Sequence, residues 1–279
     1  MARTATVKGT EKNKTNFLED WSGRVLRFAV AGALPLLLIL TWQVLSSFNM
    51  VNQSILPGPA RIVAAFKQLI VKGTYSQHVW ASMFRVIKGF LLGSSAGLAI
   101  GTVAALSPWT NQSIIALIGI LRPIPAIAYI PFLILWLGIG EESKVAVIII
   151  GAFWPVLLNT IHGIKSADSK LMEVGRAFEK NYWQVLRKIV IPSAIPSIFT
   201  GLRLGISSAW TCVVTSEMIA ASKGIGFLIA FGRELAQPNM MFVGIVSIGV
   251  IGLLIDTVVL YLQRNIIYWA PSEKGINGN

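Results

Sequence analysis

The sequence predicts an all-α membrane protein with six transmembrane helices. Of its 279 residues, 54% are hydrophobic and only 13% are charged, and the mean hydropathy is +0.67. A soluble domain usually carries about a quarter charged residues. Apolar runs of roughly 20 residues recur along the chain, which is the length that an α-helix needs to cross a bilayer. The length suits one membrane domain and leaves no room for a second globular domain.

The six predicted spans are long apolar runs separated by shorter polar segments, and they lie at 28–48, 84–106, 113–137, 144–164, 194–220 and 241–263. The first run is longer than the core of a signal peptide and shows no clear small-residue cleavage site. We therefore interpret it as a retained span. The expected organisation is an N-terminal tail at 1–27, a membrane domain at 28–265 and a C-terminal tail at 266–279.

The second predicted span is marked by small residues, and the third is marked by residues that break helices. The second has a glycine at every fourth position, at Gly89, Gly93, Gly97 and Gly101. This spacing places them on one helix face, so we expect a close helix–helix seam there rather than a pore lining. The third contains "RPIPAIAYIP", with Pro123, Pro125 and Pro131, and we expect it to be broken or strongly kinked.

The loop between the first two spans contains an amphipathic pattern. In "PARIVAAFKQLIV", five apolar residues fall on one helical stripe, namely Ile62, Val63, Phe66, Leu69 and Ile70. A helix that lies on the membrane surface is the expected structure, with docking to a partner as the alternative.

The basic residues indicate how the chain is oriented. The net charge is +12, but the Lys and Arg residues gather in a few loops and at span ends, which fits membrane orientation better than nucleic-acid binding. With the N-terminus inside, the cytoplasmic parts hold 14 of the 24 basic residues and the outer parts hold eight. The sequence therefore predicts that both termini are cytoplasmic.

Patterns of known catalytic or metal sites are missing from the sequence. There is no H-E-x-x-H, no G-x-S-x-G and no G-x-x-x-x-G-K-[ST]. The single cysteine, Cys212, is expected to be a small core residue. His78 and His162 fit no metal-ligand spacing. These observations argue against an intramembrane enzyme.

One charged segment, "EVGRAFEKNYWQVLRKIVIP" at 173–192, interrupts the apolar spans. Plotted as a helix, it has an apolar stripe opposite its charges, formed by Leu171, Val174, Phe178, Tyr182, Val185 and Ile189. Ser166, Asp168 and Ser169 offer N-caps, and Pro192 and Pro196 are expected to stop or redirect the chain. The pattern predicts one or two amphipathic helices, and it leaves open whether they rest on lipid or dock into a partner.

This segment resembles the EAA loop of permease subunits of ATP-binding-cassette (ABC) importers. Glu173, Ile189 and Pro192 match the motif in position, whereas Val174 and Gly175 replace its two alanines and Glu179 replaces its glycine. A glycine would permit a bend between two short helices, and Glu179 could instead let the helix continue. The stretches "RPIPAIAYIPFLILWLGIGEESK" and "IPSAIPSIFTGLRLGISSAWTCVVTSEMIAASKGIGFLI" are also similar to permeases that import nitrate, sulfonates, taurine or bicarbonate.

The resemblance implies a type I ABC importer permease (MetI-like) fold, with 165–192 as a cytoplasmic coupling loop. It implies a homodimer in a bacterial inner membrane, served by two cytoplasmic ATPases and an extracytoplasmic solute-binding protein. ATP and magnesium would then bind to the ATPase, so no cofactor is expected in this chain. The expected ATPase contacts are Glu173, Arg176, Ala177, Phe178 and Tyr182.

Charged residues inside the predicted spans are candidates for the translocation path, because ionisable groups in a membrane are costly unless they are paired or functional. The candidates are Arg122, Arg203 and Glu217. A structural alternative is that Arg203 pairs with Glu217, or that Asp256 caps a packed interface. Guanidinium groups suit small oxyanions, and the resemblance favours aliphatic sulfonate, then nitrate or bicarbonate. The alternative function is a secondary transporter driven by an ion gradient.

Overall fold

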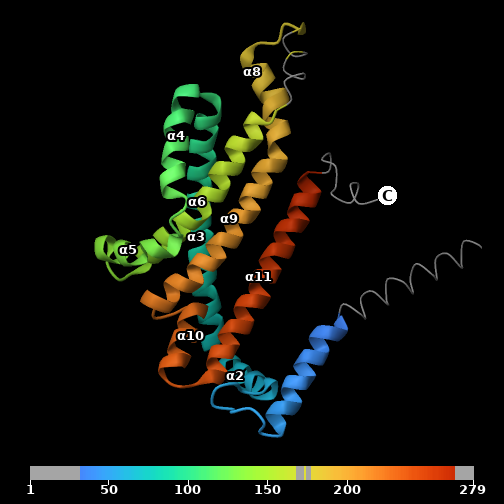
Figure 1. Cartoon of the computed structure of the whole chain (residues 1–279), viewed down its shortest axis with the longest axis vertical. Helices are drawn as coiled ribbons and strands as arrows, with labels where there is room; N and C mark the ends of the chain where they lie inside the picture. Colours follow the sequence, from blue (N-terminus) through green and yellow to red (C-terminus); the bar gives the residue numbers. More distant parts are fainter. Residues whose placement is uncertain (1–31, 168–172, 174–176, 268–279) are drawn as a thin grey trace, which may run out of the picture. The chain divides into compact units, whose positions relative to one another are not determined.

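The computed structural model describes residues 32–167, 173 and 177–267, and every regular element among them is helical. The chain forms two compact units that meet at Ala64 and Ala65, within helix α2 (Pro59–Val71). The second unit contains the helix bundle, which is drawn in Figure 1.

The first unit contains an apolar helix at Gly32–Ser47 and the start of α2. The loop between them is held by short polar contacts. The Gln43 side-chain oxygen accepts a hydrogen bond from the Ala60 backbone N–H at 3.0 Å, and Gly58 lies directly against Ser46. The predicted first span, 28–48, is therefore helical over its described part, which is shorter than the membrane-length helices of the second unit.

The second unit is built from helices that the sequence pattern largely predicts. After the remainder of α2, the elements are α3 (Thr74–Leu106), α4 (Pro108–Leu121), the 3₁₀ turn η1 (Ala126–Tyr129), α5 (Ile130–Leu137), α6 (Glu141–Lys165), α8 (Tyr182–Val185), the π-helix η2 (Leu186–Val190), α9 (Ile191–Ala220), α10 (Ile225–Glu234) and α11 (Pro238–Ile266). Among the described residues, four helices are long and apolar enough to cross a membrane, or five if the bent pair counts as one span. The predicted number of six is not confirmed.

The glycine ladder of α3 forms the predicted helix–helix seam. A Cβ atom at Gly93 would lie 2.6 Å from the Ile149 carbonyl oxygen, and one at Gly97 would lie 2.9 Å from the Phe153 carbonyl oxygen. Only glycine lets the backbones of α3 and α6 approach this closely. The expectation of a seam is therefore confirmed.

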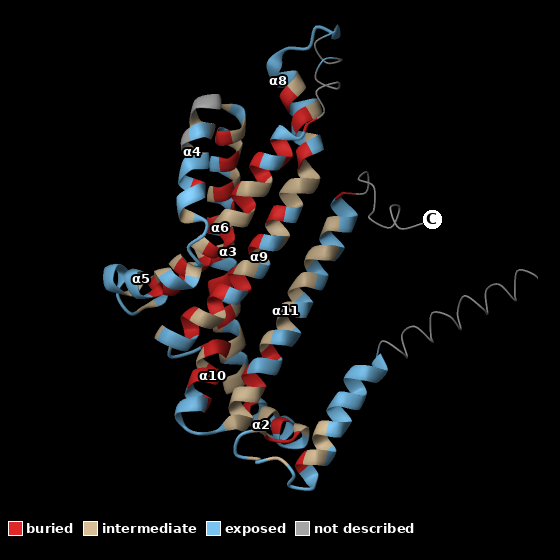
Figure 2. Cartoon of the chain, in the orientation of Figure 1, coloured by how far each residue is buried: buried red, intermediate tan, exposed pale blue. Residues whose placement is uncertain are grey.

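A second close seam joins α6 to α9. A Cβ atom at Gly201 would meet Asn159 at 2.7 Å, and one at Gly205 would meet Val156 at 2.9 Å. Cys212 packs against Gly151 of α6 and is buried, as predicted for a small core residue. Figure 2 shows that the buried residues concentrate on α3, α6 and α9, whereas α11 is more exposed.

The third predicted span is broken, as its prolines indicate. Its two helical parts, Ile114–Leu121 and Ala126–Leu137, meet at an angle of 84°. The break falls at Arg122–Pro125, where Pro123 and Pro125 cannot donate backbone hydrogen bonds to a continuing helix. The pair is thus a broken span or a re-entrant segment.

The prediction that Pro192 and Pro196 stop or redirect the chain is wrong. Helical structure continues without interruption from Tyr182 through η2 into α9. The Ile191 N–H bonds to the Leu186 carbonyl, five residues back, so the π-turn shifts the hydrogen-bond register before Pro192. Pro192 then falls in the first turn of α9, where its missing N–H is tolerated.

Candidate coupling and ion-pair sites

The predicted coupling loop, residues 165–192, has a bend at Glu179. Glu173 and Ala177 are helical, and the chain then turns at Phe178 and Glu179. Glu179 has φ 54°, a left-handed conformation that normally favours glycine. The bend that the motif glycine would permit is therefore present with a glutamate in its place, and the suggestion that the helix continues through Glu179 is wrong.

Helix α8 begins at a well-formed cap just after this bend. The Asn181 side chain accepts from the Gln184 backbone N–H at 2.9 Å, and the Gln184 side chain accepts from the Asn181 N–H at 3.3 Å. This reciprocal capping box satisfies two backbone donors at the start of the helix. The cap fixes where α8 starts, and α8 continues through η2 into α9.

Three aromatic side chains of this segment are exposed: Phe178 at 72%, Tyr182 at 62% and Trp183 at 73%. A group of large apolar side chains exposed together marks a surface that contacts a partner or a membrane. The sequence analysis missed Trp183 because it plotted the segment with a single helical periodicity, in which Trp183 lies off the apolar stripe. The capping pattern Asn181–Gln184 was the signal that could have revealed a new helix start.

Farther along the segment, the buried residues are Leu186 and Val190, each one position after the predicted stripe residues Val185 and Ile189, which are half-buried. Leu186 and Val190 are buried in a cluster with Ile164, Ala167 and Ala194, and Val185 packs against it. A cavity of about 350 Å³ lies beside this cluster, and its lining includes Leu106, Lys180 and Tyr182. Among the described residues of the coupling segment, those at 177–184 are exposed, as are Arg187 and Lys188. Glu173, Ala177, Phe178 and Tyr182 are exposed, while Arg176 lies outside the described residues.

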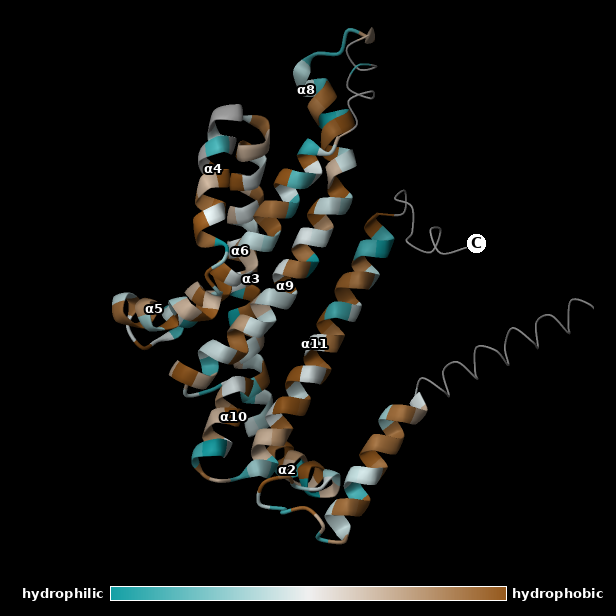
Figure 3. Ribbon diagram, viewed as in Figure 1, coloured by the Kyte–Doolittle hydropathy of each residue, from teal (hydrophilic) through white to brown (hydrophobic). Residues whose placement is uncertain are grey.

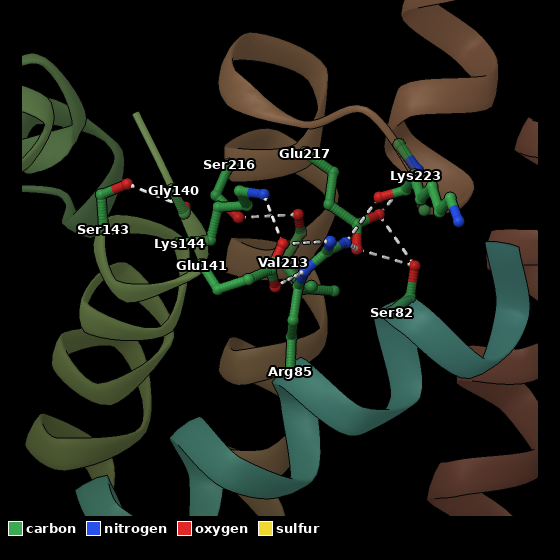
Figure 4. A network of polar contacts seen from close by, with 12 residues as sticks. Ser82, Arg85, Gly140, Glu141, Ser143, Lys144, Val213, Ser216, Glu217 and Lys223 are labelled. Carbon is green, nitrogen blue, oxygen red and sulfur yellow. Dashed lines mark hydrogen bonds and ion pairs between the residues drawn. The ribbon is translucent and has the colours of Figure 1, made fainter. Parts of the chain in front are cut away.

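At the opposite end of the bundle, a group of charges joins α3, α6 and α9; its Arg85, Lys144 and Glu217 are buried, while Glu141 is exposed (Figure 4). Arg85 binds Glu217 through Nη1 at 2.6 Å, and it binds Glu141 through Nε at 2.6 Å and Nη2 at 2.7 Å. Lys144 Nζ lies 2.7 Å from the same Glu141 carboxylate. Two cations thus face two carboxylates, and this balance offsets the cost of removing the charges from water.

The loop before α10 completes this Arg85 cluster. The Gly226 N–H donates to Glu217 at 2.9 Å, and the Ser82 hydroxyl donates to the same carboxylate at 2.8 Å. Gly224 has φ 138°, and a side chain there would collide with the Glu217 carboxylate. The glycines therefore let the loop bring its backbone donors close to Glu217.

The three predicted path residues lie in three different environments. Glu217 is buried within the Arg85 cluster, so in this conformation its side chain faces no open path. The expected pairing of Arg203 with Glu217 is wrong. Arg203 instead pairs with Asp256 of α11, and Glu217 pairs with Arg85. Arg122 is exposed at the end of α4, next to the break.

Arg85 was missed because the sequence analysis placed the second span at 84–106, so that Arg85 counted among the basic residues near its outer end. Helix α3 actually begins at Thr74, which brings Arg85 well inside it. The useful signal was the four-residue spacing of Arg85, Gly89 and Gly93, which places Arg85 on the face that packs against α6.

Together these features define a helical membrane protein with a broken span and an exposed segment, 177–184, that leads directly into a long helix. Comparisons with known proteins identify it further. The chain belongs to the family of binding-protein-dependent transport system inner membrane components, whose model matches residues 93–268. It is thus the permease subunit of an ABC importer and a multi-pass inner membrane protein.

Several relatives resemble the chain over most of its length. A Bacillus subtilis protein that is named as the aliphatic sulfonates transport permease SsuC is 39% identical to this chain over 242 residues. The match covers 87% of this chain and 88% of that protein. The taurine transport system permease protein TauC of Escherichia coli is 30% identical and covers 85% and 88%. The nitrate import permease protein NrtB of Synechocystis is 30% identical and covers 95% of each chain.

Solved structures share the fold at lower identity. An inward-facing MetNI methionine ABC transporter has a chain with a TM-score of 0.60 and 19% identity, and the match covers 69% of this chain and 96% of that chain. An amino acid ABC transporter matches with a TM-score of 0.61 and 14% identity, over 72% and 97%. The MetI-like fold is therefore confirmed. No similarity favours the alternative of an ion-driven secondary transporter.

Proposed function

We propose that two copies of this chain enclose a path for a small oxyanion, with aliphatic sulfonate as the first candidate and nitrate or bicarbonate next. A solute-binding protein delivers the anion, and two cytoplasmic ATPases, which bind ATP and magnesium, drive its passage. The observation that carries this proposal is the capped helix α8 with its exposed aromatic side chains, which continues into the membrane-length helix α9.

The coupling segment is suited to transmit movement from an ATPase. Glu173, Ala177, Phe178 and Tyr182 present an exposed surface that a groove in the partner can cover, and Arg176 is expected to contribute to it. Aromatic side chains contribute strongly at such interfaces, while the charges set orientation and register. Because α8, η2 and α9 are continuous, a displacement at Tyr182 passes directly into α9.

The substrate assignment is supported by relatives and by charge. The relatives named for aliphatic sulfonates are 39% and 34% identical, whereas those named for taurine and nitrate are each 30% identical. Taurine is itself an aliphatic sulfonate. Arg122 and Arg203 supply guanidinium groups at or within membrane helices, and these groups pair readily with oxyanions. The buried Glu217 is left out of the proposed path.

A mutation that weakens binding of the ATPase to the permease tests the coupling proposal. We expect Glu173→Lys combined with Ala177→Asp to weaken binding of the partner ATPase by at least about tenfold, or about 1.4 kcal/mol. The reason is that the double variant reverses one charge and adds another on the proposed contact surface. Co-purification from detergent-solubilised membranes, with quantified permease in the membrane fraction, measures the effect.

The matched control introduces the same two side chains, Lys and Asp, at the other end of the bundle. Glu142→Lys with Ser222→Asp changes two residues that are not buried near the Arg85 cluster, and it should leave ATPase binding intact. Equal binding of the ATPase by wild type and by the Glu173→Lys, Ala177→Asp variant would show that this segment is not the contact.

A further inference from the structure

A second ion pair, between Arg203 and Asp256, differs from the Arg85 cluster in its exposure. Arg203 Nε lies 2.9 Å from Asp256 Oδ1, and Arg203 Nη2 lies 3.1 Å from Oδ2. This bidentate pair joins α9 to α11, yet the two side chains remain 37% and 38% exposed. The Arg85 side chain, in contrast, is only 5% exposed.

The pair lies deep within its helices. Arg203 is twelve residues after Ile191 and seventeen before Ala220, or about 18 Å and about 26 Å at 1.5 Å per residue. The hydrocarbon core of a bilayer is about 30 Å thick. A residue about 18 Å and about 26 Å from the two ends of a membrane-spanning helix therefore lies inside this core. A half-exposed ion pair at that depth is costly in lipid, and such residues normally face water or protein. The exposed side of this pair therefore does not face lipid chains.

Other polar groups continue this surface along α9. Thr200, Ser207 and Thr211 are exposed, and together with Arg203 they follow spacings of three, four and four residues. Residues at these spacings share one helix face. Each of the three hydroxyls donates a hydrogen bond to the backbone carbonyl four residues earlier. The distances are 3.1 Å for Thr200, 3.0 Å for Ser207 and 3.2 Å for Thr211. We call this set of four residues the α9 polar face.

Helix α11 presents a different surface. Its most exposed side chains include Leu253, Leu254 and Val258, each more than half exposed. In Figure 3, brown predominates along α11, while α9 is paler and more mixed. This contrast fits a lipid-facing side for α11 and a water-facing side for α9.

We propose that Arg203 is a transient binding site for the transported oxyanion, and that Asp256 is the counter-ion which the anion displaces. This inference rests on the proposed function, and it adds the binding site of the anion and the way in which the anion is released. The guanidinium fork that now holds two carboxylate oxygens can hold two oxygens of a sulfonate, nitrate or bicarbonate in the same way. Return of Asp256 to Arg203 then releases the anion, so the site does not trap its substrate. The hydroxyls of the α9 polar face can rotate to donate to the passing anion.

Charge-selective labelling of a cysteine tests the site without any need to know the substrate. The chain has one cysteine, so Ser207→Cys in a Cys212→Ala background gives a single reporter one turn from Arg203. In membrane vesicles that contain the assembled importer, we expect a water-soluble anionic thiol reagent, 2-sulfonatoethyl methanethiosulfonate, to modify this cysteine. Its rate should exceed that of the matched cationic reagent by about tenfold, because the sulfonate can displace Asp256 and bind the Arg203 guanidinium.

Two further measurements complete the test. Arg203→Gln in the same background should abolish the preference for the anionic reagent, and added ethanesulfonate should slow labelling only when Arg203 is present. Leu254→Cys on α11, exposed on the side of the helix away from Asp256, is the lipid-facing control and should resist both reagents. Absence of labelling at position 207, or labelling that ignores charge, would overturn the proposal.

Transport by a variant in which both charges are replaced distinguishes an anion-binding site from a purely structural ion pair. In Arg203→Met with Asp256→Leu, both charges are replaced by apolar groups, a change that often preserves or improves stability. A purely structural pair predicts nearly normal uptake, whereas an anion site predicts at least a tenfold loss with ATPase assembly retained. If the wild-type importer carries none of the three oxyanions, the proposed substrate is wrong, while the labelling result still decides whether the site exists.

Discussion

Glu179 has a backbone conformation that is unusual for any residue other than glycine. It occupies the glycine position of the EAA motif and adopts φ 54°. A left-handed conformation costs a non-glycine residue roughly 1–2 kcal/mol. The chain nevertheless bends there, since the Asn181 cap starts a new helix immediately afterwards. The surrounding structure thus imposes the bend, and the glycine is not required for it.

Glu179→Gly should therefore stabilise the permease complex. Glycine removes the left-handed strain but is more flexible in the unfolded chain, so the net gain is about 0.5–1 kcal/mol. We expect the thermal midpoint of the purified complex to rise by about 1–4 °C. Ala177→Gly is the matched control, because Ala177 is helical and glycine there should destabilise by up to about 1 kcal/mol. A lower midpoint for Glu179→Gly would contradict this account of the bend.

The α3–α6 seam is one of the two close helix–helix seams that hold the bundle together. At Gly93, a Cβ would meet the Ile149 backbone oxygen at 2.6 Å and the Ala152 Cβ at 3.0 Å. Backbone atoms cannot move aside as a flexible side chain can. Even one methyl group must therefore separate the two helices, and overpacking of this kind typically costs about 1–3 kcal/mol.

Gly93→Ala should lower the thermal midpoint of the detergent-solubilised protein by several degrees. Gly119 of α4 provides the control, because a Cβ there has nothing within 4 Å. Gly119→Ala should leave stability unchanged or raise it by up to about 1 kcal/mol, since alanine is the better helix former. Equal midpoints for the two variants would show that the seam is looser in the membrane protein than in this structure.

The sequence predicted these elements unequally, for physical reasons. Periodic glycine and clustered proline are local signals, so the seam at Gly93 and the break near Pro123 were both predicted correctly. The pairing of charges depends on which helices are neighbours. For that reason the partners of Arg203 and Glu217 could not be read from spacing, and Arg85 was overlooked. The continuous helix through Pro192 depends on a π-turn, which no residue pattern in the segment announces.

At the scale of the whole molecule, two features connect the ends of the second unit. Close seams bind α3, α6 and α9 to one another, and the Arg85 cluster ties the same three helices together at the end that carries α10. At the other end, α8 and η2 lead into α9. A force applied to the coupling segment is therefore expected to move these helices together and to change the surroundings of the α9 polar face.

ATP-dependent uptake in reconstituted vesicles tests this account most directly. Vesicles would hold the permease and its ATPase, with the binding protein outside and ATP inside, and accumulation of a labelled aliphatic sulfonate would be followed over time. We predict accumulation that requires ATP and the binding protein, and its loss in the Glu173→Lys, Ala177→Asp variant. Uptake that proceeds without ATP, driven by an imposed ion gradient, would contradict the account.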